Sequence, residues 1–274
     1  MKRREFMTAA CAAGLAAASI KAAQAQAPAS KPYLLDFRLT TTPNAQRMEA
    51  MVKRHGEETI PIVNKYGVSP CGIFVPDVAM NAKETGYDKK YDKVLVALVP
   101  HQSFEASEEL AAKMRADTQF VEMQAAFVAA QAATAQNPMY TAQEKMLLQC
   151  IPDYPTVKAP PLTPNRILRL RMYRSHNYER NRAQIRQFTV EGGVLEIFAE
   201  CGIHLVFLSQ VLYGAFVPGV VFMMSFENEE QMTDAWAKFR VHPGWLKLKD
   251  DPQYADTATE VINIFLKPCK GSQV

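Results

Sequence analysis

Five short blocks of this chain recur in the same order 116 to 135 residues further along, and this internal repeat constrains the fold more than any other feature. The paired blocks are Tyr33–Thr40 with Arg166–Tyr173, Asn44–Gly67 with Asn177–Gly202, Ser103–Glu105 with Ser225–Glu227, Lys113–Phe120 with Lys238–Trp245, and Thr141–Leu148 with Thr257–Ile264. One similarity of this kind would be unremarkable. Five in order indicate two copies of one structural unit.

Each copy is predicted to run strand, helix, strand, strand, helix, strand. The opening segments alternate apolar and polar residues, as half-buried strands do. The helix that follows ends in each copy at a glycine, Gly67 or Gly202, which suits a left-handed C-cap. The middle strands are expected at Val68–Val75 and Lys93–Val99 in the first copy, and at Ile203–Val217 and Gly219–Phe226 in the second.

This order is the ferredoxin-like βαββαβ pattern. We therefore expect an α+β fold in which two tandem ferredoxin-like units pair their sheets face to face, as an intrachain dimeric α/β barrel with the helices outside. The expected boundaries are a leader at 1–27, a first unit at 31–150, a proline-rich linker at 151–165 and a second unit at 166–268. The first unit has two extra stretches, a polar hairpin loop at 81–92 and an Ala/Gln-rich run at 123–136 that predicts an extended helix.

The first 27 residues have the composition of a signal peptide. Arg3 and Arg4 precede a short apolar run, Thr8–Ile20, and small-residue A-x-A patterns follow as far as Ala27. The paired arginines resemble a twin-arginine (Tat) signal. A membrane span needs about 20 apolar residues, so an uncleaved N-terminal anchor is the less favoured alternative. We expect Tat export to the periplasm or beyond, with no transmembrane span after cleavage.

The charge of the chain changes once this leader is removed. The whole chain has 31 basic and 28 acidic residues. The leader holds four of the basic residues and one of the acidic residues, so 27 of each remain. A neutral body lacks the basic surface that nucleic-acid binding requires, and we expect no nucleic-acid partner.

Four cysteines follow the leader, at positions 71, 150, 201 and 269. In an exported protein they could form disulfides, with three possible connectivities. The chain is long enough to bury a core without covalent links, so free buried cysteines are an equally weighted alternative.

The opening strands, the glycine-ended first helix and a K-[FM]-R block leading to an aromatic residue are together similar to the NIPSNAP family of the dimeric α/β-barrel superfamily. Members of this family often carry E-x-R-x-Y in the first strand. The first copy keeps the acid and the arginine as Asp36 and Arg38, without the tyrosine. The second keeps Arg171 and Tyr173, with Arg169 in place of the acid.

The second copy is the better match. Arg240 and Trp245 fit the family's second-helix end well, whereas Arg115 and Phe120 fit it loosely. The resemblance covers nearly all of the chain after the leader. It implies the barrel fold and no settled reaction.

The histidine in KFRVHPGW (Lys238–Trp245) invites a functional role. However, the counterpart of His242 in the first copy is Asp117, so the copies do not share a histidine here. A residue before proline avoids the helical region. We interpret His242 as a helix stop, with a ligand-binding role in a specialised second copy as the alternative.

The sequence lacks the common motifs of metal and nucleophilic chemistry. It has no helical H-x-x-x-H pair, no C-x-x-C, no G-x-S-x-G and no glycine-rich phosphate loop. We predict no metal site and no cofactor, and we assign no catalytic residue. Because some members of the wider superfamily bind haem, His204 or His242 would be the candidate haem ligands.

The opening strands carry a sharper hypothesis, because alternate residues of a strand share one face. If the apolar faces pack under the helices, the polar faces line the barrel interior. A buried arginine is costly unless it is paired, so the arginines are either paired internally or available to a ligand carboxylate, phosphate or carbonyl. The candidate ligand-binding residues are Asp36, Arg38, Arg169, Arg171, Tyr173 and His242.

Three functions are compatible with these features. The leading hypothesis is an exported NIPSNAP-like protein that binds a small molecule or a partner without strong catalysis. The second is a cofactor-free oxygenase or isomerase, so whether the chain is an enzyme stays open. The third is a non-catalytic periplasmic scaffold. Since one chain supplies both halves of the barrel, we expect a monomer or a weak homodimer.

Overall fold

The computed structural model of the chain describes residues 31–274, and the predicted leader lies outside these residues. The first half contains β1 (Leu34–Thr41), α1 (Ala45–Lys53), the π-helix η1 (Arg54–Thr59), α2 (Ile60–Lys65), β2 (Gly72–Pro76), α3 (Val78–Asn81), the 3-10 helix η2 (Lys89–Lys93), β3 (Val94–His101), α4 (Phe104–Ala116), α5 (Thr118–Gln131) and β4 (Ala142–Cys150). The second half contains β5 (Ile167–Arg174), α6 (Tyr178–Phe188), α7 (Val194–Glu200), β6 (His204–Tyr213), β7 (Gly219–Phe226), α8 (Glu229–Val241), α9 (Pro243–Leu248), the 3-10 helix η3 (Pro252–Tyr254) and β8 (Glu260–Pro268).

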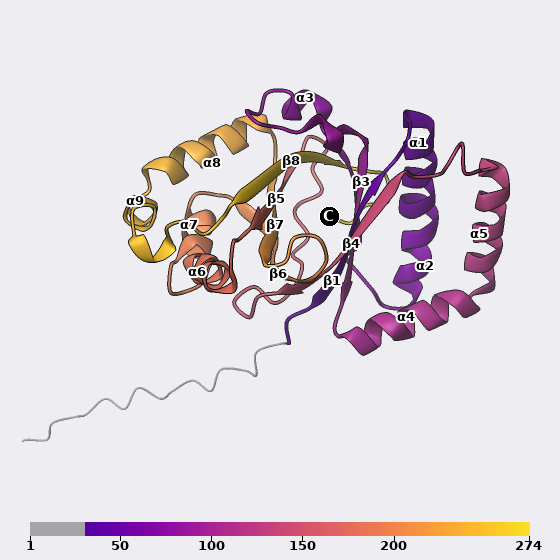
Figure 1. Cartoon of the computed structure of the whole chain (residues 1–274), viewed down its shortest axis with the longest axis horizontal. Helices are drawn as coiled ribbons and strands as arrows, with labels where there is room; N and C mark the ends of the chain where they lie inside the picture. Colours follow the sequence, from indigo (N-terminus) through magenta and orange to yellow (C-terminus); the bar gives the residue numbers. More distant parts are fainter. Residues whose placement is uncertain (1–30) are drawn as a thin grey trace, which may run out of the picture.

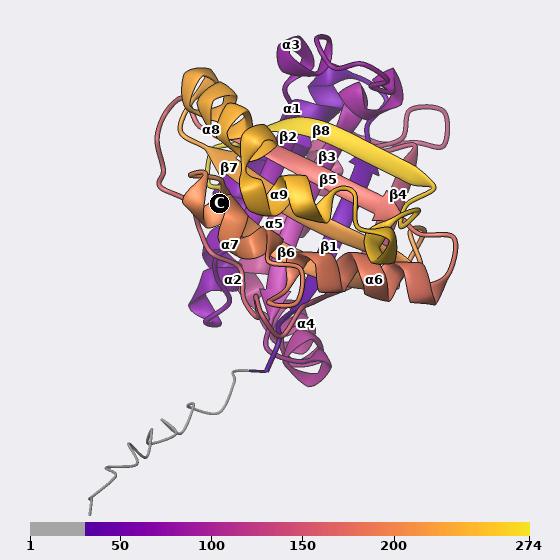
Figure 2. The same ribbon diagram turned by 90° about the vertical axis from the view of Figure 1, so that its left-hand side faces the viewer.

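The eight strands form one closed antiparallel barrel in the order β1-β3-β2-β8-β5-β7-β6-β4. The first half contributes β4-β1-β3-β2 and the second β8-β5-β7-β6, which is the same order in each. The halves meet at two seams, β2 with β8 and β4 with β6. The helices of the two halves lie on opposite sides of the strands (Figure 1), and Figure 2 looks onto α6, α8 and α9 of the second half. The expected architecture of two ferredoxin-like units closed into one barrel is confirmed.

The barrel interior is filled by apolar side chains from both halves. Leu35, Phe37 and Leu39 of β1 belong to the same buried cluster as Leu168 and Leu170 of β5. The expectation that the charged faces of these strands line the interior is therefore wrong. Two sheets that close on each other bury a larger continuous apolar surface than a helix layer covers, so the apolar faces turn inward. The polar faces turn outward, toward the helices.

Equivalent residues begin and end the first helices of the two halves. The side chains of Asn44 and Asn177 each accept a hydrogen bond from the backbone N–H three residues further on. Gly67 and Gly202 both have φ of 78°, the left-handed conformation that glycine adopts readily after a helix. These positions confirm the repeat.

Two blocks of the repeat align differently from the sequence comparison. Ser103 caps α4, and the residue that caps α8 is Asn228, three positions beyond the expected counterpart. Thr141 donates to the last carbonyl of β1, and Thr259 donates to the last carbonyl of β5, two positions beyond the expected counterpart. The two-residue shift leaves every side chain of β8 on its expected face, because strands have a period of two.

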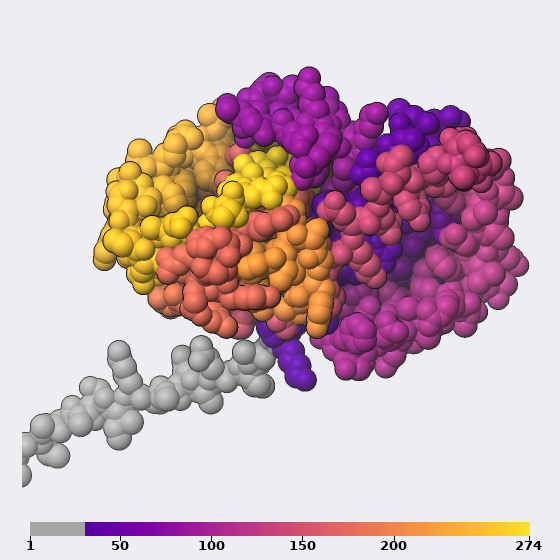
Figure 3. All heavy atoms as spheres, viewed as in Figure 1, coloured from indigo at the N-terminus to yellow at the C-terminus, as the bar shows by residue number. Residues whose placement is uncertain are grey.

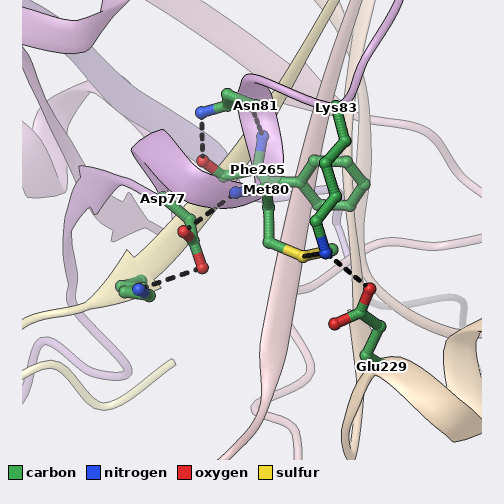
Figure 4. Close-up of polar contacts among 7 residues, drawn as sticks. Asp77, Met80, Asn81, Lys83, Glu229 and Phe265 are labelled. Atoms are coloured by element: carbon green, nitrogen blue, oxygen red, sulfur yellow. Dashed lines mark hydrogen bonds and ion pairs between the residues drawn. The ribbon is translucent and has the colours of Figure 1, made fainter.

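The extra hairpin loop of the first half forms polar contacts with the second half. Asn81, at the end of α3, is fully buried and pairs with the backbone of Phe265 in β8. Its Nδ2 donates to the Phe265 carbonyl at 3.0 Å, and its Oδ1 accepts from the Phe265 N–H at 2.7 Å (Figure 4). Further along, Lys83 and Glu229 form an ion pair at 3.0 Å. The loop thus continues the pairing with β8 beyond the point where β2 ends.

The proline-rich segment 151–165 contains neither helix nor strand and runs beside β6. The N–H groups of Ile151 and Lys158 donate to carbonyls of β6 at 3.1 and 2.8 Å. The Ala/Gln-rich run of the first half is helical over residues 123–131, in α5, whereas its last five residues, 132–136, lie beyond the helix. Within residues 31–274, none of the helices combines the length and the hydrophobicity of a membrane span.

Candidate functional site

A cavity of about 610 Å³ lies in the first half, between the outer face of its sheet and the helices that cover it. β1, β3 and β4 supply the floor, and α1, η1, α2, α4 and α5 supply the walls. These helices form the group at the right of Figure 1, and Figure 3 shows the same end of the molecule in space-filling form. The lining residues Val128 and Tyr140 are exposed, so the cavity reaches the surface beside them.

The floor contains a compact network of charges. Asp36 accepts two hydrogen bonds from Arg38, with its Oδ1 2.9 Å from Nε and its Oδ2 2.6 Å from Nη2. Lys145 Nζ lies 3.1 Å from the same carboxylate. Burial by itself would raise the pKa of Asp36, but the hydrogen bonds and charges of Arg38 and Lys145 hold that pKa below its ordinary value. The carboxylate is therefore ionised at neutral pH and already fully engaged.

His101 stands at the end of β3 beside this network. Its side chain is buried and lines the cavity. Burial is the main reason that the pKa of His101 is lowered. Its Nδ1 is buried and has no hydrogen-bond partner among the described residues.

The wall opposite the sheet contains the π-helical segment η1. A π-helix closes i→i+5 hydrogen bonds, and such segments are frequent at functional sites. Arg54, His55 and Thr59 of this segment line the cavity. In the second half the same stretch is a break between α6 and α7. The equivalent stretch is therefore a π-helix in the first half and an interruption between two helices in the second. The half with the π-helix contains the cavity.

Arg54 is the most buried cation of the wall. Its side chain is 7% exposed, and the guanidinium lies 4.9 Å from the ring centroid of Phe127 and 5.6 Å from that of Phe120. Nη2 donates to the side chain of Gln124. Nη1 is buried and has no hydrogen-bond partner among the described residues.

His55 is the next residue of the same wall. Burial, followed by the positive charges of Arg54 and Arg38, lowers the pKa of His55 to about 4. The imidazole is therefore neutral at pH 7. The wall presents one fixed cation and one neutral ring to the cavity.

In the second half, the corresponding layer between sheet and helices is packed with aromatic rings. They are Phe188, Phe198, Phe222, Phe226, Trp236, Phe239 and Trp245. Neighbouring centroids in this cluster lie 4.7 to 6.3 Å apart, as in well-packed aromatic clusters. Counted from the capping asparagine, Phe188 occupies the position of His55. The second half fills with rings the layer that the first half leaves open.

The six residues proposed from the sequence do not form one site. Asp36 and Arg38 line the cavity. Arg169 and Arg171 lie on the outer face of β5, under the second-half helices. Arg169 Nη2 lies 2.8 Å from Glu84 Oε2, and the Arg171 guanidinium lies 5.0 Å from the ring centroid of Tyr173. That these side chains bind a ligand stays a prediction.

His242 forms the corner between α8 and α9. Its Nδ1 accepts from the N–H of Gly244 at 3.1 Å, and its Nε2 lies 2.7 Å from Glu200 Oε2. Asp117 occupies the equivalent corner between α4 and α5 and caps α5 by accepting from the N–H of Phe120. Both corners are structural, and both ring nitrogens of His242 are engaged. His204, on β6, lies with Nε2 3.2 Å from the carbonyl of Lys158.

The cysteines and the metal-ligating residue types do not converge in the described part of the chain. The four cysteines are free, and burial raises the pKa of Cys71, Cys150 and Cys269 to about 12. Residues 31–274 contain no group of three His, Cys, Asp or Glu side chains placed to hold a metal ion.

Sequence reasoning missed Arg54, His55 and His101. One signal was visible: the first-helix blocks differ in length by two residues, since their starts are offset by 133 and their ends by 135. That difference marks the place where η1 replaces the break of the second half. It does not reveal which half contains the cavity.

The architecture is that of a dimeric α/β barrel built within one chain. Two solved structures share it over most of the chain. A proposed monooxygenase from Lactobacillus acidophilus NCFM has a TM-score of 0.54 at 14% identity, covering 88% of this chain and 98% of that one. A proposed monooxygenase from Fusobacterium nucleatum has a TM-score of 0.53 at 10% identity, covering 88% and 94%. At these identities the likeness establishes the fold.

Residues 168–273 match the model of the NIPSNAP family. The match lies in the second half, where the sequence motifs were better preserved. An uncharacterized NIPSNAP-like domain protein from Burkholderia xenovorans is 21% identical over 38% of this chain and 85% of its own, with a TM-score of 0.32. Among curated proteins, none matches this chain.

Proposed function

We propose that this is an exported NIPSNAP-like protein that binds a small, largely apolar molecule in the first-half cavity, without strong catalysis. One observation carries the proposal: of two halves with the same topology, one keeps about 610 Å³ open under its helices and the other fills that layer with aromatic rings. Interiors pack closely because open volume forfeits contacts. An open layer of this size beside a packed counterpart indicates a retained binding site.

The dimensions and lining of the cavity support this proposal. Small-molecule sites typically occupy about 300–1,000 Å³ and combine apolar walls with a few polar groups. Here Leu95, Leu110 and Met114 supply apolar surface, while Arg54 and His101 supply unpaired polar atoms. This is a different place from the barrel interior that the sequence suggested.

The test is a titration with N-phenylnaphthylamine, a neutral aromatic probe that fluoresces in apolar surroundings. We expect saturable binding of one probe per chain. Ala111→Phe, on α4, places a ring in the cavity and should abolish probe binding. The matched control is Ala199→Phe, at an exposed position of α7, which should bind like the parent protein. Equal binding by both variants would contradict the proposal.

A cofactor-free oxygenase or isomerase is the second candidate. The observation that favours it is His101, whose buried imidazole has an unpartnered Nδ1 beside the cavity, since such chemistry needs a group that can accept a substrate proton. The two structures of similar fold are themselves proposed monooxygenases. To test it, the molecule that co-purifies with the protein is incubated in air with the parent protein and with His101→Ala. A mass change that requires His101 would favour the enzyme over the binding protein.

We also propose that the chain is exported through its paired arginines. Fractionation of the native host should find the protein outside the cytoplasm. Replacing both residues, as Arg3→Lys and Arg4→Lys, should retain it inside if the route is twin-arginine dependent. Unchanged export would indicate another route.

A further inference from the structure

Arg54 has the least complete set of partners among the cations of the cavity. Its nearest acid is Glu58, with Oε2 3.9 Å from Nη1, at the limit of an ion pair. Nη1 has no hydrogen bond among the described residues. Burial lowers the pKa of Arg54, and the charge of Glu58 only partly opposes that effect. A buried guanidinium with one distant acid is costly in the empty site.

The other charges of the cavity do not compensate for Arg54. Arg38 and Lys145 share the carboxylate of Asp36 on the floor. Glu108, the second acid of the lining, is exposed on α4. The lining therefore has three cations and two acids, and Arg54 is the cation whose nearest acid, Glu58, lies outside the lining and at the limit of an ion pair.

The surroundings of Arg54 also define the shape of the group that would meet it. Phe120 and Phe127 of α5 lie against the guanidinium, with centroid distances of 5.6 and 4.9 Å. They provide flat apolar surface next to the charge. Gln124, between them on the same helix, holds Nη2 and so orients the guanidinium. An aromatic or cyclic molecule with one acidic group matches this arrangement.

We propose that the ligand of the cavity is an anionic aromatic or cyclic molecule, and that Arg54 is the residue that selects its carboxylate, sulfonate or ionised hydroxyl group. This inference rests on the proposed function, because it concerns the same cavity. The anion completes the partners of a cation that the fold already holds in place. Arg54 acts as a specificity-determining residue, and the inference requires no chemical step.

The experiment compares two probes that differ in one charge. Anilinonaphthalene sulfonate is N-phenylnaphthylamine with a sulfonate group added, and both fluoresce on binding to apolar sites. We expect Arg54→Gln to lower the affinity for the sulfonate probe roughly tenfold or more, since a charge-assisted hydrogen bond contributes about 1.5–3 kcal/mol. The affinity for the neutral probe should change less than about threefold, since no charge-assisted hydrogen bond to it is lost.

Two further variants keep the comparison decisive. Arg54→Lys retains the charge and should recover a large part of the preference for the sulfonate, even if Arg54→Gln proves unstable. Arg182→Gln, at an exposed position of α6, removes a guanidinium outside the cavity and should change neither probe. Thermal unfolding of each variant verifies that it is folded at the temperature of the titration.

The outcomes separate this inference from the proposed function. If the parent protein binds neither probe, the proposed function fails. If both probes bind and Arg54→Gln leaves their ratio unchanged, the cavity binds ligands but Arg54 does not select an anion. If Arg54→Gln weakens both probes equally while folded, Arg54 only shapes the cavity, and the inference is overturned. A selective loss of sulfonate-probe binding in Arg54→Gln, recovered in Arg54→Lys, supports the inference.

Discussion

His55 links the cavity to the stability of the fold. Its pKa of about 4 lies well below the value near 6.5 of an unfolded chain, because burial and two nearby guanidinium groups disfavour the imidazolium. As pH falls from about 6.5 toward 4, the unfolded chain takes up a proton that the folded protein does not. The free energy of unfolding therefore falls through this window. Below about pH 4 this residue causes no further loss.

His55→Gln should remove this part of the pH dependence. Between pH 7 and pH 5 we expect the parent protein to lose about 1–2 kcal/mol of unfolding free energy that the variant keeps. Urea unfolding at the two pH values measures the difference. If the parent and the variant lose the same amount, another group is responsible, and the imidazole is not buried as the structure has it.

Asn81 is the residue on which the contact between the hairpin loop and β8 depends. Asn81→Ala removes two hydrogen bonds and leaves the buried N–H of Phe265 without a partner, while the Phe265 carbonyl still accepts from Asp77. We expect a loss of about 1–3 kcal/mol of unfolding free energy, measured by urea unfolding. Asn165→Ala, at an exposed asparagine, is the control and should change it by less than about 0.5 kcal/mol. A similar loss in both variants would mean that the loop contact does not stabilise the protein.

At the scale of single elements, the sequence predicted the elements well and their orientation poorly. Period-two strands and the terminal glycines Gly67 and Gly202 are local signals, so the positions of the strands and of the first helices followed from them. The face that turns into the barrel was not predictable in this way. Both faces of β1 are covered, one by the opposite sheet and one by helices, and alternation alone does not say which layer receives the apolar side chains.

The aromatic layer of the second half shows the same limit. The rings of that layer, Phe198, Phe222, Phe226, Trp236 and Phe239, have Val63, Ala97, His101, Ala111 and Met114 at the matching positions of the first half. The open volume arises because these side chains and His55 stand where the second half has rings, in a wall that contains η1 in place of the break between α6 and α7. The replacements can be read from the aligned repeat, but whether they leave open volume or are filled by neighbouring side chains depends on three-dimensional packing.

Phe188→Ala measures how tightly that layer is packed. Phe188 contacts the rings of Phe198 and Phe222, with centroids 6.2 and 5.0 Å away. Its removal should cost about 3–5 kcal/mol of unfolding free energy, as expected for a buried phenylalanine. Phe104→Ala, at a position 57% exposed on α4, should cost far less. A small loss for Phe188→Ala would show that the second-half layer is loose, and the contrast between the halves would be lost.

At the scale of the whole molecule, the chain combines a closed barrel with two unequal helix layers. Both strand seams are formed within residues 31–274, and in this part of the chain the closed barrel leaves no sheet edge open for a second copy. The second half, which matches the family model, is packed, and the first half contains the cavity. Under the proposed function, one copy preserves the packed layer while the other accommodates the ligand.

A closed barrel in one chain predicts a monomer. Light scattering on the mature protein at micromolar concentration should give the mass of one chain, with at most weak association at higher concentration. A stable dimer that persists on dilution would mean that an outer helix face is an interface, and the cavity would then have to be considered together with that face.

The most direct test of the account is native mass spectrometry of mature protein purified from its own host, compared with Ala111→Phe and Arg171→Ala. We predict a bound small molecule on the parent protein and on Arg171→Ala, and none on Ala111→Phe. A ligand that persists in Ala111→Phe and disappears in Arg171→Ala would place the site in the second half and contradict the account. A parent protein without any bound mass would contradict it as well.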